Sequence, residues 1–104
     1  MRLDPAALEQ LRDLGGEEFV VELTATFLDE APPLLAALRG SDVDEVRRAA
    51  HTLKSNGATF GATRLSELCR ELEERARAGD LSGAPALADR IDAEYALVAE
   101  ELRR

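Results

Sequence analysis

The chain contains a single histidine, His51, a side chain that can serve either as a nucleophile or as a metal ligand near neutral pH. The residues three and four positions away are Arg47, Arg48, Lys54 and Ser55. On a helix these positions adjoin the histidine, and none of them supplies the carboxylate that a metal site would need. Metal binding is therefore disfavoured, whereas the cations would suit a phosphoryl group attached to the ring.

The rest of the sequence lacks the features of several enzyme classes. Cys69, the single cysteine, is predicted on a different helix face from His51, so a cysteine-histidine dyad is not expected. Glycine loops of the GxxxxGK[ST] or GxGxxG type are absent, and the chain is therefore expected to bind neither ATP nor another cofactor. The acidic run at residues 71–74 is interpreted as part of a solvated helix face.

Charge is distributed unevenly along the chain. The formal net charge is −8, which disfavours nucleic acid as a partner. Residues 46–70 nevertheless contain five basic side chains against one acidic side chain, whereas the remaining residues contain eight basic and twenty acidic ones. His51 therefore lies in a basic segment of an acidic protein.

Apolar residues recur at helical spacing between glycine and proline punctuation. We expect helical segments at residues 5–14, 17–38, 43–60, 62–78 and 85–102. The pair Pro32-Pro33 would kink the second segment or divide it in two. Short connections between amphipathic helices favour an all-α fold, with residues 1–104 forming a single domain. The predicted architecture is an antiparallel up-down four-helix bundle with a short N-terminal covering helix.

The apolar stripe of the third segment predicts the orientation of His51. At about 100° per residue, His51 falls about 140° from the stripe that includes Val46, Leu53 and Phe60. Its ring should therefore face solvent, while Leu53 should be buried. The cationic neighbours favour the neutral ring, whose free nitrogen is a nucleophile. Because the small Ala58 would let another protein approach the ring, this combination predicts phosphoryl transfer between proteins.

The same segment resembles the motif of a known family. Residues 50–62 read Ala-His-Thr-Leu-Lys-Ser-Asn-Gly-Ala-Thr-Phe-Gly-Ala, and a leucine-rich segment follows at residues 65–73. This pattern is similar to the His-x-Leu-Lys-Gly-Ser-Ser-x-x-Leu-Gly-Ala motif of the histidine-containing phosphotransfer (HPt) domain of two-component phosphorelays. The resemblance implies that His51 is the phosphorylated residue and that Lys54 neutralises the phosphoryl oxygens.

The resemblance also implies a surface for partner proteins around His51. We expect this surface to include Arg47, Arg48, Ser55, Ala58, Gly61 and Ala62. The Gly61-Ala62 pair would also allow a close turn between the two central helices. Ser55 replaces the family's glycine, and Asn56 and Gly57 replace two small hydroxyl residues. Asn56 and Gly57 are expected near the phosphoryl group, and Ser55 and Asn56 would either donate hydrogen bonds to it or make room.

The function implied by the resemblance is that of a phosphorelay intermediate without kinase activity of its own. His51 would accept a phosphoryl group from the aspartate of one receiver domain and pass it to another. Response-regulator receiver domains and a hybrid histidine kinase would be the partners, and the receiver would bring Mg²⁺. Since no segment is a signal peptide or a membrane span, we expect a cytoplasmic monomer that binds neither nucleic acid nor membrane.

Two other functions are compatible with an exposed helical histidine. One is a non-catalytic helical adaptor that docks a receiver domain without being phosphorylated, although such a surface has no need of both His51 and Lys54. The other is the dimerisation domain of a histidine kinase, which would be joined to an ATP-binding domain for which 104 residues leave no room.

Overall fold

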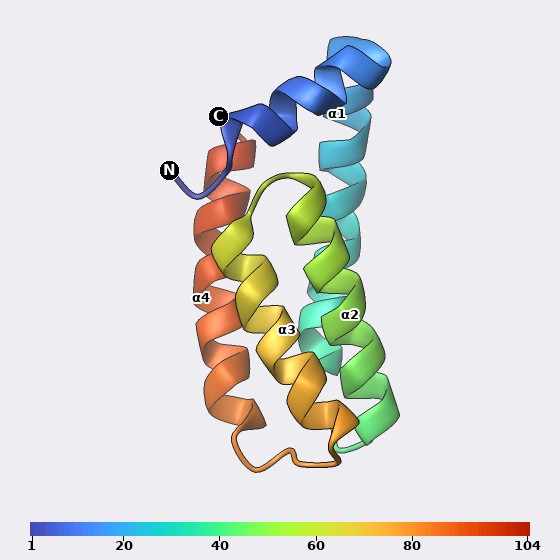
Figure 1. The fold of residues 1–104 in the computed structure, drawn as a ribbon, viewed down its shortest axis with the longest axis vertical. Coiled ribbons are helices and arrows are strands. Elements are labelled where there is room, and N and C mark those ends of the chain that lie inside the picture. Colours follow the sequence, from blue (N-terminus) through green and yellow to red (C-terminus); the bar gives the residue numbers. More distant parts are fainter.

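The computed structural model describes residues 1–104, which form four helices and no strands (Figure 1). The helices are α1 (Pro5–Ala37), α2 (Val43–Thr59), α3 (Thr63–Arg77) and α4 (Ala84–Leu102). Successive helices run antiparallel, and the first part of α1 crosses one end of the bundle (Figure 1). The predicted up-down four-helix bundle with a short covering helix is therefore confirmed.

The ends of the helices follow from local side-chain chemistry. The carboxylate of Asp4 accepts a hydrogen bond from the backbone N–H of Ala6 at the start of α1, and Pro5 occupies the first helical position. The carboxylate of Asp42 accepts bonds from the backbone N–H groups of Asp44 and Glu45 at the start of α2. Asp4 and Asp42 are thus the N-cap residues of α1 and α2.

A bend in α1 separates its covering part from its bundle part. Gly16 has φ 81° and ψ −177°, values that are open to glycine and interrupt the helix. Pro32 and Pro33 lie inside α1, and the backbone around them keeps helical angles. The prediction of two abutting helices at these prolines is therefore wrong, and the division of α1 lies at Gly16.

The helices pack as a closed ring around one apolar core. α2 makes its most extensive contacts with α3, while α1 contacts α2 and α4, and α4 contacts α3. Phe27 of α1 lies between Phe60 and Tyr95, with ring centroids 5.2 and 5.8 Å away. None of the four helices combines the length and the apolar character needed to cross a membrane.

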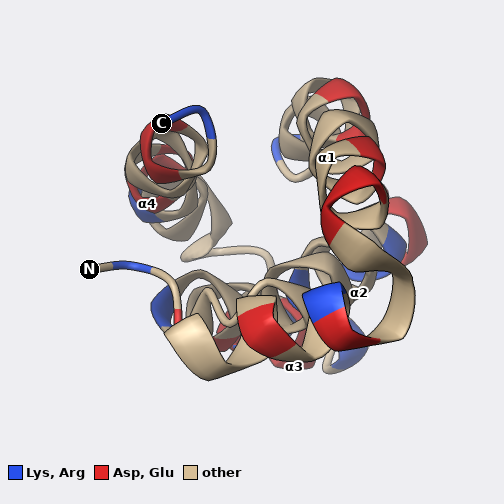
Figure 2. Ribbon diagram, turned by 90° about the horizontal axis from the view of Figure 1, so that it is seen from above, with Lys and Arg blue, Asp and Glu red and all other residues tan.

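Nearly all charged residues are exposed or half-buried, and acidic residues are found along α1, α3 and α4 (Figure 2). Two acidic residues depart from this pattern, because Glu73 on α3 and Glu94 on α4 are buried. A buried carboxylate is costly unless it is paired, so both require an explanation. Arg2 and Arg64 lie within ion-pair distance of Glu94, and the partners of Glu73 define the site described next.

Candidate functional site

His51 lies on the outer face of α2, with 58% of its side chain exposed. Leu53, two residues later, is fully buried in the core. Side chains two residues apart on a helix point in nearly opposite directions, so the core packing of Leu53 forces His51 outward. The predicted orientation of both residues is confirmed.

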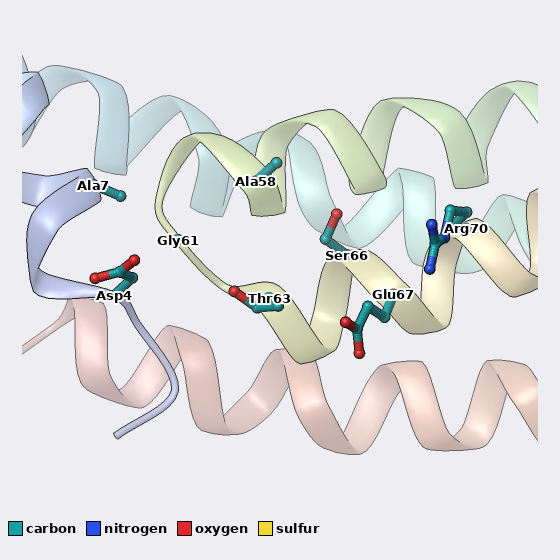
Figure 3. Close-up of a pocket in the computed structure, with 8 residues that line it drawn as sticks. All are labelled: Asp4, Ala7, Ala58, Gly61, Thr63, Ser66, Glu67 and Arg70. Atoms are coloured by element: carbon teal, nitrogen blue, oxygen red, sulfur yellow. The ribbon is translucent and has the colours of Figure 1, made fainter.

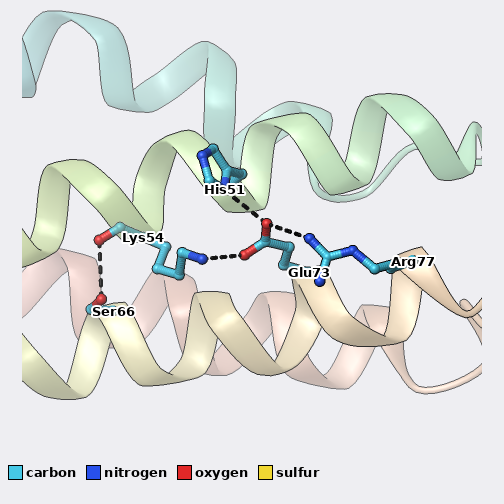
Figure 4. A network of polar contacts seen from close by, with 5 residues as sticks. All are labelled: His51, Lys54, Ser66, Glu73 and Arg77. Atoms are coloured by element: carbon cyan, nitrogen blue, oxygen red, sulfur yellow. Dashed lines mark hydrogen bonds and ion pairs between the residues drawn. The ribbon is translucent and has the colours of Figure 1, made fainter.

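Glu73 of α3 lies beneath His51 and binds three side chains (Figure 4). Its Oε2 is 2.8 Å from Nδ1 of His51 and 3.2 Å from a guanidinium nitrogen of Arg77. Its Oε1 is 2.6 Å from Nζ of Lys54. Only 2% of the Glu73 side chain is exposed, so these three donors replace water as its hydrogen-bonding partners.

This carboxylate corrects two sequence-based expectations. The run at residues 71–74 is not wholly solvated, because Glu73 is buried, and the surroundings of His51 are not purely cationic. One feature of the sequence could have revealed the burial of Glu73. Glu73 lies four residues after Cys69 and three before Ala76, which is the spacing of the buried stripe of α3. A glutamate on that stripe needs partners, and the adjacent face of α2 offers His51 and Lys54.

The ionisation of Glu73 determines which nitrogen of His51 is free. Burial acts to raise the pKa of Glu73, but hydrogen bonds and Coulombic attraction from Lys54 and His51 outweigh it, and the pKa lies below its usual value. The carboxylate is therefore ionised near neutral pH and can only accept hydrogen bonds. Nδ1 of His51 must then carry the hydrogen, which leaves the lone pair of the neutral ring on the outward Nε2.

Lys54 is held at both its head and its backbone. Its side chain is 28% exposed and reaches Glu73, while its backbone carbonyl accepts a hydrogen bond of 3.0 Å from the hydroxyl of Ser66 on α3 (Figure 4). These contacts tie the two central helices together beside His51. The ammonium group therefore remains close to the ring and half-accessible to a ligand.

Among the residues expected on the partner surface, Arg48, Ser55 and Ala58 are exposed on α2, and Arg47 is half-buried. Ala62 is fully buried, so its expected place on that surface is wrong: it packs in the core at the start of α3.

The glycine of the Gly61-Ala62 pair does permit the close turn between α2 and α3. Gly61 has φ 70°, and its carbonyl accepts a 3.0 Å bond from the backbone N–H of Asp4. Gly61 is therefore half covered by the N-terminal segment.

The two residues expected near the phosphoryl group face other helices. Gly57 is buried and lies against Leu65 and Ser66 of α3. Asn56 is half-buried and lines a small cavity with Leu23 and Thr26 of α1. Neither shares the face of His51, because both lie more than 100° from it around the axis of α2.

A polar hollow of about 360 Å³ lies between the end of α2, the start of α3 and the N-terminal segment (Figure 3). It is lined by Asp4, Ala7, Ala58, Gly61, Thr63, Ser66, Glu67 and Arg70. The small side chains of Ala7 and Ala58 leave room for a segment of another protein. No three His, Cys, Asp or Glu side chains of the chain are grouped so that they could hold a metal ion.

Comparisons with known proteins agree with this geometry. A model of the Hpt domain family matches residues 22–101. The chain is 35% identical over 77 residues to the sensor protein TorS of Escherichia coli, which covers 70% of this chain and 8% of TorS. It is 26% identical over 103 residues to histidine-containing phosphotransfer protein 5 of Arabidopsis thaliana, which covers 92% of this chain and 66% of that protein. The chain thus spans less than two thirds of the length of either relative.

The fold has a close counterpart among solved structures. The crystal structure of histidine-containing phosphotransfer protein B (HptB) from Pseudomonas aeruginosa PAO1 matches with a TM-score of 0.90 and 33% sequence identity. The match covers 98% of this chain and 91% of that chain. The likeness therefore extends over the whole bundle, including the covering part of α1.

Proposed function

Because this chain belongs to the Hpt domain family and so has a phosphotransfer role in two-component phosphorelays, we propose that His51 accepts a phosphoryl group from the aspartate of one receiver domain and passes it to another. The observation that carries the proposal is the bond from His51 Nδ1 to the buried Glu73, which leaves Nε2 as the exposed nucleophile. The chain has no nucleotide-binding loop, and its role is that of a carrier without kinase activity.

In the proposed step, the lone pair of Nε2 attacks the phosphorus of the receiver's aspartyl phosphate. The N–P bond forms, the bond between phosphorus and the aspartate oxygen breaks, and the carboxylate leaves with the bonding electrons. The ring keeps its hydrogen on Nδ1 and becomes positively charged, and Glu73 stabilises that charge through the 2.8 Å bond. Transfer to the next aspartate is the reverse, with no proton exchanged with solvent.

Lys54 supplies charge for the phosphoryl oxygens in this proposal. Its ammonium group has three donors on a flexible stem and is already held next to the ring by Glu73. The receiver domain would bring the acidic pocket and the Mg²⁺. We place this exchange in the cytoplasm, between a hybrid histidine kinase and a response regulator, with the chain acting as a monomer.

The proposed docking surface is centred on His51 and extends along α2 over Ser55 and Ala58. Arg47 and Arg48 give it a basic rim that complements an acidic receiver pocket, so binding should weaken as salt rises. A bulky side chain in Ala58→Trp should block docking while His51 keeps its environment. Wild-type receiver affinity in this variant, or no effect of salt on the native protein, would place the interface elsewhere.

The proposal is tested by incubating the protein with a phosphorylated receiver domain and measuring acid-labile, base-stable phosphate. Wild type should take up phosphate, and His51→Gln should take up none, with a thermal midpoint close to that of wild type because the side chain is exposed. Phosphate on the His51→Gln variant would place the site elsewhere. Receiver binding without phosphate on wild type would favour the helical adaptor.

A further inference from the structure

Glu73 holds two cations that differ in how they could respond to a phosphoryl group on His51. Lys54 alone binds Oε1, whereas Arg77 shares Oε2 with the histidine (Figure 4). Because Glu73 is 2% exposed, water does not replace a donor that leaves it. The carboxylate therefore needs a cation at all times.

A phosphoryl group on Nε2 brings about −1.5 to −2 charges to within reach of the same ammonium group. Lys54 is a flexible point charge, and it cannot serve the phosphoryl oxygens fully while it is held on Oε1 of Glu73. Its movement to the phosphoryl group requires another cation to take over the carboxylate. Phosphorylation makes the His51 ring positively charged, but its Nδ1–H stays on Oε2, so His51 does not replace Lys54 at Oε1.

Arg77 has the geometry for this exchange. It lies one helical turn after Glu73 on α3, and its guanidinium carries five N–H donors of which the 3.2 Å bond to Oε2 uses one. A guanidinium can bind both oxygens of a carboxylate at once. The Arg77 side chain is 62% exposed, so it can shift across Glu73 without repacking the core.

Building on the proposed function, we propose that Arg77 is a positioning residue for phosphotransfer: it takes over Glu73 when Lys54 moves to the phosphoryl group on His51. Arg77 acts through Glu73 and Lys54 and does not itself bind the phosphate. Its removal should therefore leave the unphosphorylated site intact and weaken the phosphorylated one.

The same helix provides a matched control. Arg75 pairs with Glu71 at the same spacing of four residues, with a nitrogen-oxygen distance of 3.8 Å. Glu71 is exposed and contacts neither His51 nor Lys54. Arg75→Ala thus removes the same charge and the same kind of ion pair without touching the site.

The experiment measures the equilibrium of phosphoryl transfer between the full chain and a receiver domain. The receiver domain is phosphorylated with acetyl phosphate and Mg²⁺, and the same domain is used for all variants. Arg77→Ala should reduce the ratio of phosphohistidine to aspartyl phosphate by about threefold to tenfold, less than the loss of a buried charge-assisted bond because the Arg77 side chain is 62% exposed and screened by solvent. Arg77→Lys should restore most of the ratio, and Arg75→Ala should leave it unchanged. Thermal midpoints of the three variants check that each is folded.

A double variant distinguishes this exchange from a direct phosphate contact. In a Lys54→Ala background no lysine has to be released, so adding Arg77→Ala should not shift the equilibrium further. Additive losses would show that Arg77 acts on the phosphate independently and would overturn the inference, as would equal ratios for Arg77→Ala and Arg75→Ala. A wild-type protein that takes up no phosphate would instead contradict the proposed function itself.

Discussion

Gly57 provides a sharp test of how α2 and α3 pack, because its substitution by alanine should stabilise the protein. Gly57 is buried where the two helices approach each other. A Cβ atom added there would lie 3.6 Å from the carbonyl oxygen of Ala62, from Cδ2 of Leu65 and from the backbone nitrogen of Ser66. These are ordinary van der Waals distances, so the methyl group fits without displacing α3.

The expected gain comes from the backbone. Alanine is favoured over glycine by about 1 kcal/mol within a helix. Gly57 is the third residue from the end of α2, where the helix is less constrained, so we expect Gly57→Ala to stabilise the protein by about 0.5 kcal/mol. For a domain of this size, that corresponds to a rise of about 2 to 4 °C in Tm.

Thermal and urea unfolding measure this effect, and phosphate transfer to His51 provides the second measurement. Because Gly57 faces α3, the transfer rate should equal that of wild type. Destabilisation by more than about 1 kcal/mol would show that the helices lie closer together than the 3.6 Å contacts allow. A stable variant with impaired transfer would show that Gly57 lies near the phosphoryl group, as its position in the motif implies.

Three further predictions concern other parts of the molecule. Gly61→Ala should destabilise the protein by about 1 to 3 kcal/mol, as measured by urea unfolding. The φ angle of Gly61 is 70°, and the new Cβ would lie 2.8 Å from the backbone nitrogen of Asp4 and 2.9 Å from Cβ of Ala7. An unchanged unfolding midpoint would show that the N-terminal segment does not pack on this turn. Cys69 is fully buried, and burial raises the pKa of its thiol to about 12. At neutral pH the thiol should therefore react with a thiol reagent only as fast as the protein unfolds. Rapid labelling of the native protein would contradict the burial of Cys69. The lowered pKa of Glu73 means that its contribution to stability is complete above the ordinary glutamate pKa and is lost as pH falls through the folded value. On acidification below about pH 5, wild type should therefore lose more unfolding free energy than Glu73→Gln does. A stability difference between the two proteins that is independent of pH would show that this carboxylate is not paired in solution.

The sequence determines the helices and their orientation because both depend on neighbours a few residues apart. The cap at Asp42 and the spacing of Val46, Leu53 and Phe60 predict α2 and its buried face. The outward direction of His51 follows from that face. Lys54, three residues later, is adjacent to His51 on any helix that contains both, so the pair could be predicted without knowledge of the fold.

The tertiary structure alone decides what lies beneath the histidine. Glu73 is 22 residues from His51 and on another helix, and their contact depends on how far α3 is displaced along α2. A slip of a single residue moves a helix by about 1.5 Å, enough to break a hydrogen bond of 2.8 Å. That displacement is set by the packing of the whole core, and a sequence read in local windows does not contain it. The stripe of α3 can indicate that Glu73 is buried, but its contact with His51, and with it the hydrogen on Nδ1 and the free Nε2, follows from the packing of α2 against α3.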